Sequence, residues 1–408
     1  MKCGLLGRKL GHSYSPQIHA MLGDYSYRLF EKEPEEIGDF LKNGDFTGIN
    51  VTMPYKQDVI PYLDELYPIA RKLGAVNTIV RRQDGTLIGH NTDYFGFQWM
   101  LETSGLKISG KKVLVLGTGG ASKPVAEVLR NAGAQVVMIS RSGDNNYQNL
   151  QLHADAAAIV NTTPLGMYPG NGVSPVDLDR FPRLEGVLDI IFNPARTRLL
   201  LDAARRGIIA VGGLSMLVAQ AKEASEWFMG ASIADSEIDR IHSYLSRRLQ
   251  NIVLIGMPGC GKSTIGTLLA RRTGRSFADA DETIISLAGK PIPQIFAEDG
   301  EGVFRDWETQ ALADLGKQSG LVIATGGGCV TKERNYDLLH QNSIILWLKR
   351  DLNQLPTEGR PLSQTGKLAQ MYEMRKPLYE AFSDITIDNI GTPNETVDAI
   401  ITHLEGMK

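Results

Sequence analysis

The chain reads G-M-P-G-C-G-K-S-T over residues 256–264, and the expected organisation of the rest of the chain can be arranged around this motif. An apolar run precedes it at 251–255 and a helical pattern follows at 265–272, so the order is strand, glycine-rich loop, helix. The spacing G-x-x-x-x-G-K-[ST] is typical of a loop whose backbone N–H groups and helix N-terminus hold a di- or triphosphate. A chance glycine turn is the competing interpretation, and the correct flanking elements disfavour it.

The loop residues have separate expected tasks. Lys262 supplies a mobile positive charge, and the hydroxyl of Ser263 can reach a Mg²⁺ ion. The residues that we expect to contact the nucleotide are Gly259, Cys260, Gly261, Lys262, Ser263 and Thr264. Such a loop usually opens its domain, yet about 250 residues precede it here, so another domain must come first.

Composition agrees with a chain of several domains. At 408 residues the chain exceeds what one core normally supports, and 42% hydrophobic with 22% charged residues suits an α/β protein. A net charge of −3 gives no reason to expect a nucleic-acid or membrane partner. The start of the chain lacks the apolar core of a signal peptide, and three scattered cysteines cannot form a disulfide framework. We therefore expect a cytoplasmic enzyme.

The first hundred residues alternate predicted strands and helices and place polar side chains in the loops. Ser13 and Ser15 flank a tyrosine before a proline, where two hydroxyls can donate to a carboxylate or one can simply cap a helix. Lys56 follows the strand at 48–51, at the edge of the sheet where α/β sites gather. Asp93 comes from another loop, and one lysine with one aspartate suffices to move a proton on a hydroxyl.

A βαβ unit is predicted next. The buried strand at 113–116 runs into G-T-G-G-A-S-K and a helix, but Ser122 stands where the third glycine of G-x-G-x-x-G would be. The following strand ends in Ser-Arg-Ser instead of an acidic residue. Arg141 among hydroxyls suits a 2′-phosphate, which favours NADP over NAD, although a surface arginine is the plainer interpretation. A helix predicted at 236–250 then leads into the 251–255 strand without a flexible linker.

Residues 1–249 resemble shikimate dehydrogenase over their whole length. The motifs are H-S-Y-S-P-Q-I-H, N-V-T-M-P-Y-K, G-A-V-N-T, N-T-D, G-T-G-G-A, N-T-T-P-L-G-M and G-G-L-S-M-L-V-A-Q, in the family's order. The resemblance implies two α/β lobes: a substrate lobe at about 1–98 and 222–249, and a Rossmann NADP lobe at about 99–221. It also implies NADPH-dependent reduction of 3-dehydroshikimate to shikimate.

Site residues follow from this resemblance by position. Lys56 and Asp93 would be the catalytic pair, and Lys56 would protonate the developing alkoxide. The substrate contacts would be Ser13, Ser15, Thr52, Asn77, Phe192, Gln220 and Asp93 itself. The NADP site would be lined by Gly117, Thr118, Gly119, Gly120, Ala121, Ser140, Arg141, Ile190 and Gly213. Three positions depart from the family pattern and bear on affinity more than on activity: Phe192 replaces a tyrosine, Ala20 an asparagine, and Ser140 the first residue of an N-R-T run.

The second half also carries acidic and basic motifs. F-A-D-A-D-E at 277–282 predicts an extended segment in which Asp279 and Asp281 face opposite sides, one toward metal and one toward substrate. Arg305 lies on a predicted helix beside aromatic residues. The strand at 321–324 ends in T-G-G-G, where a backbone can approach a ligand closely. The repeated strand–helix order predicts a parallel sheet.

Residues 250–408 resemble shikimate kinase, a P-loop domain of the nucleoside-monophosphate-kinase type. The motifs are G-M-P-G-C-G-K-S-T, F-A-D-A-D, F-R-D-W-E, T-G-G-G, R-P-L and R-K-P-L-Y. The resemblance implies that Asp281 binds the shikimate 3-hydroxyl and prepares it for attack on ATP. Further implied roles are the carboxylate clamp (Arg305 and Arg375), a ring contact (Gly327), a lid residue at 353–364 that reaches the phosphates (Arg360), and Mg²⁺ ligands (Ser263, and Asp279 through water). We place the adenine contact near 392–394.

The two halves together predict a bifunctional enzyme of aromatic amino-acid biosynthesis that uses NADPH, ATP and Mg²⁺ on small-molecule substrates. Quinate oxidation joined to a different small-alcohol kinase is one alternative. A nucleotide-dependent switch is disfavoured because no N-K-x-D guanine motif occurs. A catalytically dead regulator is disfavoured because Lys56, Asp93, Lys262 and Asp281 are all present. Homo-oligomerisation is left open.

Overall fold

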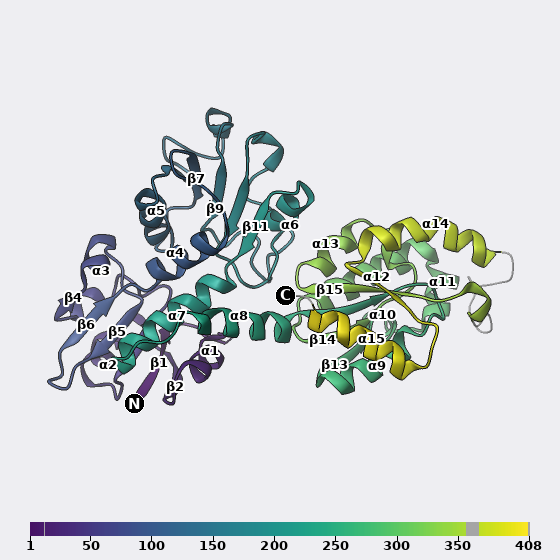
Figure 1. Cartoon of the computed structure of the whole chain (residues 1–408), viewed down its shortest axis with the longest axis horizontal. Helices are drawn as coiled ribbons and strands as arrows, with labels where there is room; N and C mark the ends of the chain where they lie inside the picture. Colours follow the sequence, from purple (N-terminus) through teal and green to yellow (C-terminus); the bar gives the residue numbers. More distant parts are fainter. Residues whose placement is uncertain (12, 356–366, 407–408) are drawn as a thin grey trace. The chain divides into compact units, whose positions relative to one another are not determined.

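The computed structural model describes residues 1–11, 13–355 and 367–406 (Figure 1). The chain divides into two compact units. The first comprises Met1–Asn193 and Leu199–Ser246, and the second comprises Pro194–Arg198 and Arg247–Lys408. Within the described ranges, no helix combines the length and the apolar character that crossing a membrane requires.

The first lobe of the first unit is a six-stranded mixed sheet. Its strand order is β2-β1-β3-β5-β6-β4, and only the β3–β5 and β5–β6 pairs are antiparallel. The strands are β1 (Lys2–Gly7), β2 (Ser26–Glu31), β3 (Gly48–Val51), β4 (Glu65–Leu66), β5 (Thr78–Arg81) and β6 (Leu87–His90). The lobe's helices are α1 (Ser15–Leu22), α2 (Ile37–Asn43) and α3 (Pro68–Leu73). A 3₁₀ turn, Pro34–Glu36, leads directly into α2.

The second lobe is an all-parallel sheet in the order β11-β10-β9-β7-β8. Its strands are β7 (Lys112–Leu116), β8 (Gln135–Ile139), β9 (Ala158–Asn161), β10 (Gly186–Asp189) and β11 (Ile209–Gly212), with helices α4 (Asp93–Thr103), α5 (Ser122–Asn131) and α6 (Arg198–Arg205). The chain leaves β7 toward β8 on one side and returns to β9 on the other. This reversal opens a crevice at the carboxyl ends of β7 and β9, where such sheets bind ligands.

Two helices complete the first unit and lead out of it. α7 (Leu214–Met229) packs against α4 and α1, so the chain returns to the substrate lobe after building the second sheet. α8 (Ser236–Leu249) follows, and β12 begins almost at once after it. Short 3₁₀ helices elsewhere in the chain span Ile60–Tyr62, Leu150–His153, Leu178–Arg180, Cys329–Thr331 and Leu352–Gln354.

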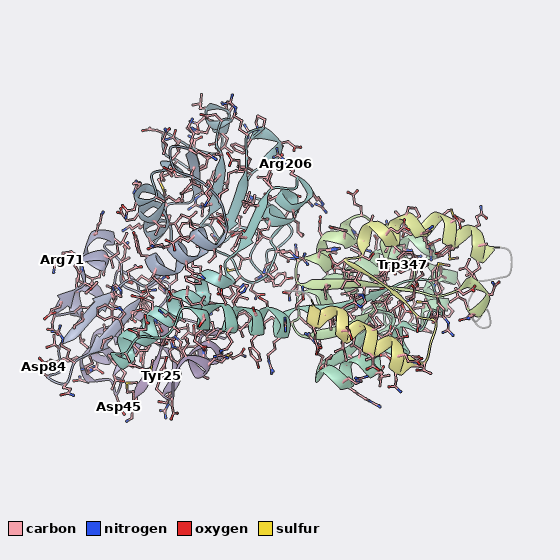
Figure 2. All side chains as sticks on the ribbon, in the orientation of Figure 1. Tyr25, Asp45, Arg71, Asp84, Arg206 and Trp347 are labelled. Carbon is pink, nitrogen blue, oxygen red and sulfur yellow. The ribbon has the colours of Figure 1, made fainter. Side chains whose placement is uncertain are left out.

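The second unit is a parallel five-stranded sheet between helices, as predicted. The order is β13-β14-β12-β15-β16, with β12 (Asn251–Ile255), β13 (Ser276–Asp279), β14 (Leu321–Ala324), β15 (Ser343–Lys349) and β16 (Ile385–Asp388). The helices are α9 (Lys262–Thr273), α10 (Ala280–Ala288), α11 (Ile292–Glu298), α12 (Gly300–Gly316), α13 (Arg334–His340), α14 (Lys367–Phe382) and α15 (Pro393–Gly406). Figure 2 shows Trp347 in the interior of this unit, where it stacks on Tyr379.

One local prediction in this unit is wrong. The segment 277–282 is not extended throughout, because β13 ends at Asp279 and α10 begins at the next residue. The Asp279 side chain accepts a hydrogen bond from the backbone N–H of Asp281 at 3.0 Å, which caps the helix. Asp281 therefore lies in the first helical turn, and the two carboxylates are not related by strand alternation.

Candidate active sites

A cavity of about 680 Å³ lies between the two lobes of the first unit. It gathers the predicted substrate side chains of the first lobe with part of the predicted cofactor loop of the second. The predicted residues that line it are Ser13, Ser15, Thr52, Lys56, Asn77, Asp93, Thr118, Gly119, Gly120, Ala121, Ile190, Phe192, Gly213 and Gln220. Residues from widely separated loops thus meet at one site.

Lys56 and Asp93 form an ion pair in this cavity. Lys56 lies in the turn after β3, and Asp93 is the first residue of α4, which fixes its carboxylate at a helix N-terminus. The Nζ of Lys56 donates to Oδ2 of Asp93 at 2.6 Å, and the side chains are 17% and 10% exposed. The pair is open enough to meet a ligand, and the aspartate holds the ammonium group in a defined position.

A buried amide network surrounds the pair. Oδ1 of Asn77 accepts from the backbone N–H of Thr92 at 2.7 Å, and the Thr92 hydroxyl lies 3.3 Å from Oε1 of Gln220. These bonds join the loop before β5, the start of α4 and the middle of α7. Asn77 and Gln220 are thereby oriented before any ligand binds, which lowers the cost of positioning a polyhydroxy ring.

Asn50 is a cavity residue that sequence reasoning missed. It is the last but one residue of β3, is buried, and lines the same cavity. Its Oδ1 accepts from the hydroxyl of Tyr27 at 2.7 Å, and its Nδ2 donates to the hydroxyl of Thr78 at 3.1 Å. The available signal was its place as the first letter of N-V-T-M-P-Y-K.

The glycine-rich turn after β7 has the geometry of a nucleotide-binding loop. Gly117 adopts φ +103°, a backbone conformation that residues other than glycine rarely adopt. Helix α5 begins at Ser122. The buried Ser122 hydroxyl donates to the carbonyl of Gly119 at 2.7 Å, so this serine closes the turn at the third glycine position. At Gly213, a Cβ would lie 2.1 Å from the carbonyl oxygen of Ile190, which leaves room for glycine alone.

Three predicted cofactor residues lie apart from the cavity wall: Gly117, Ser140 and Arg141. The hydroxyl of Ser140 accepts from the backbone N–H of Gly143 at 2.6 Å and closes a turn after β8, while Arg141 is exposed. Because β8 is the neighbour of β7, both residues follow the strand end beside the glycine loop. A dinucleotide would fit this arrangement, because the N-terminus of α5 suits a pyrophosphate and the residues after β8 suit a ribose.

The second unit contains a cavity of about 620 Å³ at the carboxyl edge of its sheet. The predicted residues that line it are Gly259, Gly261, Lys262, Ser263, Thr264, Asp279, Asp281, Arg305, Gly327 and Arg375. Cys260 is fully buried and does not line the cavity. Arg360 and most of the predicted lid lie outside the described residues.

The phosphate-binding loop is shaped before α9 begins at Lys262. Gly259 and Gly261 adopt φ +84° and +99°, which turns the backbone around the loop. Nζ of Lys262 donates to the carbonyls of Gly256 and Met257 at 2.9 and 3.1 Å, so its charge is held at the loop. Backbone N–H groups, a helix N-terminus and a lysine thus converge, as phosphate binding requires.

The oxygen atoms beside this loop fit a magnesium ion. The hydroxyl of Ser263 donates to Oδ2 of Asp279 at 2.7 Å, which brings a hydroxyl and a carboxylate oxygen together. Mg²⁺ prefers such oxygen ligands and completes its shell with phosphate oxygens and water. The two residues therefore suit a metal that arrives with a nucleotide.

The same cavity carries a charge cluster around the buried side chains of Arg305 and Glu308. Arg305 donates from Nη1 to Oε2 of Glu308 at 2.8 Å and from Nη2 to Oε1 of Glu301 at 3.1 Å. Burial works to lower the pKa of Arg305, but the two glutamates outweigh it and the pKa is raised. Burial raises the pKa of Glu308, although Arg305 works against it. Sequence reasoning missed Glu308, whose signal was a carboxylate three residues after Arg305 on one helix.

Glycines let the chain pass close to this cluster. A Cβ at Gly328 would lie 2.3 Å from Nη1 of Arg305, and one at Gly326 would lie 2.6 Å from Oε1 of Glu308. Nη1 of Arg375, from α14, donates to the carbonyl of Gly327 at 3.2 Å. The T-G-G-G segment thus lies between two arginines that can receive a carboxylate.

Comparisons with known proteins identify relatives of both units. A family model described as the shikimate dehydrogenase substrate binding domain matches residues 5–79, and one described as shikimate kinase matches residues 258–405. Shikimate dehydrogenase (NADP(+)) of Clostridium beijerinckii is 39% identical over 245 residues, which cover 55% of this chain and 90% of that protein.

Solved structures resemble the first part of the chain. Shikimate dehydrogenase 1 from Peptoclostridium difficile has a TM-score of 0.55 at 36% identity and covers 60% of this chain and 97% of its own. Quinate dehydrogenase from Corynebacterium glutamicum has a TM-score of 0.55 at 28% identity and covers 60% of this chain and 99% of its own. The chain belongs to the shikimate dehydrogenase family and carries a shikimate kinase domain after it, which makes it a bifunctional enzyme of the shikimate pathway.

Proposed function

We propose that the chain catalyses two consecutive reactions in two domains, 1–249 and 250–408. The first domain, with its substrate lobe at about 1–98 and 222–249 and its NADP lobe at about 99–221, reduces 3-dehydroshikimate to shikimate with NADPH. The second transfers the γ-phosphoryl group of ATP to the 3-hydroxyl of shikimate. The observation that carries the proposal is that each unit holds its own cavity, and each cavity gathers the side chains that its reaction needs.

In the first cavity, the reduced nicotinamide supplies the hydride and the protein supplies orientation and a proton. Lys56 donates the proton to the C3 oxygen as negative charge develops there, and Asp93 holds the ammonium group in position. Thr52, Asn77 and Gln220 hold the ring hydroxyls, and Ser13 with Ser15 binds the carboxylate. These last two residues lie around the start of α1.

Phe192 gives the substrate side of this cavity an apolar wall. Its ring packs against that of Tyr14 with centroids 5.7 Å apart. The residues that would hold the cofactor are Thr118, Gly119, Gly120, Ala121, Ile190 and Gly213. Ser140 and Arg141, which follow β8, would receive the 2′-phosphate of NADP.

In the second cavity, the protein acts by positioning and by stabilising charge. Asp281 accepts the proton of the attacking 3-hydroxyl. Arg305 and Arg375 hold the substrate carboxylate, and Gly327, which lies beside Arg375, contacts the ring. Lys262 and the N-terminus of α9 stabilise the transferring phosphoryl group, and Ser263 and Asp279 are the Mg²⁺ contacts. We assign Arg360 to the phosphates from the family resemblance.

The expected environment and partners follow from charge and chemistry. We propose a cytoplasmic enzyme that binds small molecules and, with a net charge of −3, has no nucleic-acid partner. Size-exclusion chromatography with light scattering decides between a monomer and a homo-oligomer.

One assay tests the proposed function. The purified chain, given 3-dehydroshikimate, NADPH and Mg-ATP, should oxidise NADPH and release shikimate 3-phosphate. Absence of NADPH oxidation would reject the dehydrogenase assignment, and accumulation of shikimate despite ATP would reject the kinase assignment. A parallel reaction with quinate and an oxidised nicotinamide nucleotide tests the main alternative, quinate oxidation. That alternative requires the chain to act faster on quinate than on shikimate.

A further inference from the structure

The second cavity contains a cation to which the proposed function gives no role. Arg350 follows directly after β15 and lines the cavity together with the phosphate-binding loop. β15 pairs in parallel with β12, and Ile255 at the end of β12 lies opposite Trp347. The two strands therefore end at the same edge of the sheet, which places Arg350 beside the loop that leaves β12.

The guanidinium group of Arg350 lies against this loop. Its Nη1 is 4.0 Å from the position that a Cβ would take at Gly261. The side chain of Asn389 lies 3.0 Å from the same position and donates to the carbonyl of Cys260 at 2.7 Å. Arg350 and Asn389 thus form the outer wall of the loop, next to the first turn of α9.

Arg350 differs from the other arginines of this cavity in its partners. Arg305 is paired with Glu301 and Glu308, and Arg375 donates to a carbonyl. Among the residues that the structure describes, Arg350 has no carboxylate within ion-pair distance, and its Nε is enclosed without a hydrogen-bond acceptor. The neighbouring carboxylate of Asp351 accepts from the backbone N–H of Asn353 at 2.9 Å.

An enclosed guanidinium donor without an acceptor is costly, and an anion at this place removes the cost. Arginine also matches phosphate oxygens with two parallel N–H groups. The anion that the adjacent loop is built to hold is the phosphate chain of a nucleotide. The guanidinium N–H groups of Arg350 therefore suit the phosphate chain that the neighbouring loop binds.

We propose that Arg350 is a nucleotide-binding residue that donates hydrogen bonds to the phosphate chain of ATP where the chain passes Gly261. This proposal rests on the proposed kinase function and adds to the phosphate contacts of Lys262 and the loop backbone. Arg350 follows β15, whereas the arginines proposed to bind shikimate come from α12 and α14, so Arg350 reaches the cavity from a different element.

The test compares Arg350→Met with Arg271→Met in the full-length chain. Arg271 is an exposed arginine in the last turn of α9 and serves as the matched control. Loss of a charge-assisted hydrogen bond should raise the KM for ATP about 10- to 100-fold in Arg350→Met. The KM for shikimate and the dehydrogenase rate should stay within about twofold of the wild-type values. Arg350→Lys keeps the positive charge but loses the pair of parallel N–H donors. Its KM for ATP should therefore lie between the values of the wild type and Arg350→Met.

A calorimetric titration with inorganic tripolyphosphate provides a readout that needs no phosphoryl acceptor. Its affinity should fall in Arg350→Met by about the same factor as the affinity for ATP. An ATP affinity equal to that of Arg271→Met would overturn the proposal, and so would weakened ATP binding with tripolyphosphate binding unchanged. If Arg350→Met fails to fold, the same comparison with Arg350→Lys decides. Failure of the wild-type chain to phosphorylate shikimate would instead reject the kinase function, and the titration would still report on Arg350.

Discussion

Replacing Glu308 with alanine should destabilise the second unit strongly, because it leaves a buried positive charge without its main partner. The Glu308 side chain is 0% exposed and that of Arg305 is 7% exposed, with 2.8 Å between Oε2 and Nη1. The carboxylate that would stay with Arg305 belongs to Glu301, which is 57% exposed and lies at 3.1 Å. Breaking a buried pair on one side costs about 3–5 kcal/mol, whereas an exposed pair contributes about 0–1 kcal/mol. We therefore expect Glu308→Ala to lower the free energy of unfolding by about 3 kcal/mol.

The matched control is Glu301→Ala, which removes the exposed partner from the same arginine. Its expected cost is about 0.5 kcal/mol. Amide hydrogen exchange along α12 and β14 in the full-length chain measures both, because these amides open when the second unit unfolds. A loss of 3 kcal/mol corresponds to roughly a 150-fold rise in their exchange rates at about 25 °C. Equal exchange rates in the two variants would contradict this prediction and would mean that Glu308 does not neutralise Arg305.

Two further predictions concern the first unit. Burial lowers the pKa of His19 to about 3, so the folded chain excludes a proton that the unfolded chain binds near pH 6.5. The contribution of the neutral His19 side chain to stability is therefore complete above about pH 6.5. Below that pH the free energy of unfolding falls by up to about 1.4 kcal/mol per pH unit. His19→Gln should flatten that slope in urea unfolding between about pH 7 and pH 5, and an unchanged slope would exclude His19 as its source. Arg141→Ala should raise the KM for NADPH about 10- to 100-fold with little change for NADH, because only NADPH carries the 2′-phosphate. The exposed Arg130, changed to alanine in the same way, is its control, and equal losses with both nucleotides would contradict the assignment.

The buried parallel strands could be predicted closely from the sequence. The ranges 251–255 and 321–324 coincide with β12 and β14, because strands covered on both faces read as short continuous apolar runs. The strands β4, β5 and β6 gave no comparable signal. They are short, and β5 and β6 are held by antiparallel pairing, which depends on tertiary context.

The candidate sites were predictable where a loop sequence itself sets the geometry. The phosphate-binding loop is such a case, since its glycines take the positive φ values that the turn requires. Capping chemistry made the prediction for Asp279 and Asp281 wrong, because one carboxylate begins the helix that carries the other. Asn50, Glu308 and Arg350 were missed because their place in a cavity depends on which strand or helix packs beside them.

The proposed function requires two separate active sites in one chain, and reciprocal variants test this requirement. Lys56→Ala should reduce NADPH oxidation with 3-dehydroshikimate by about 10²- to 10⁴-fold, while the chain still phosphorylates added shikimate. Lys262→Ala should lose phosphorylation to a similar degree and keep the dehydrogenase rate. If either substitution abolished both reactions in a folded protein, the account of two independent sites would be contradicted.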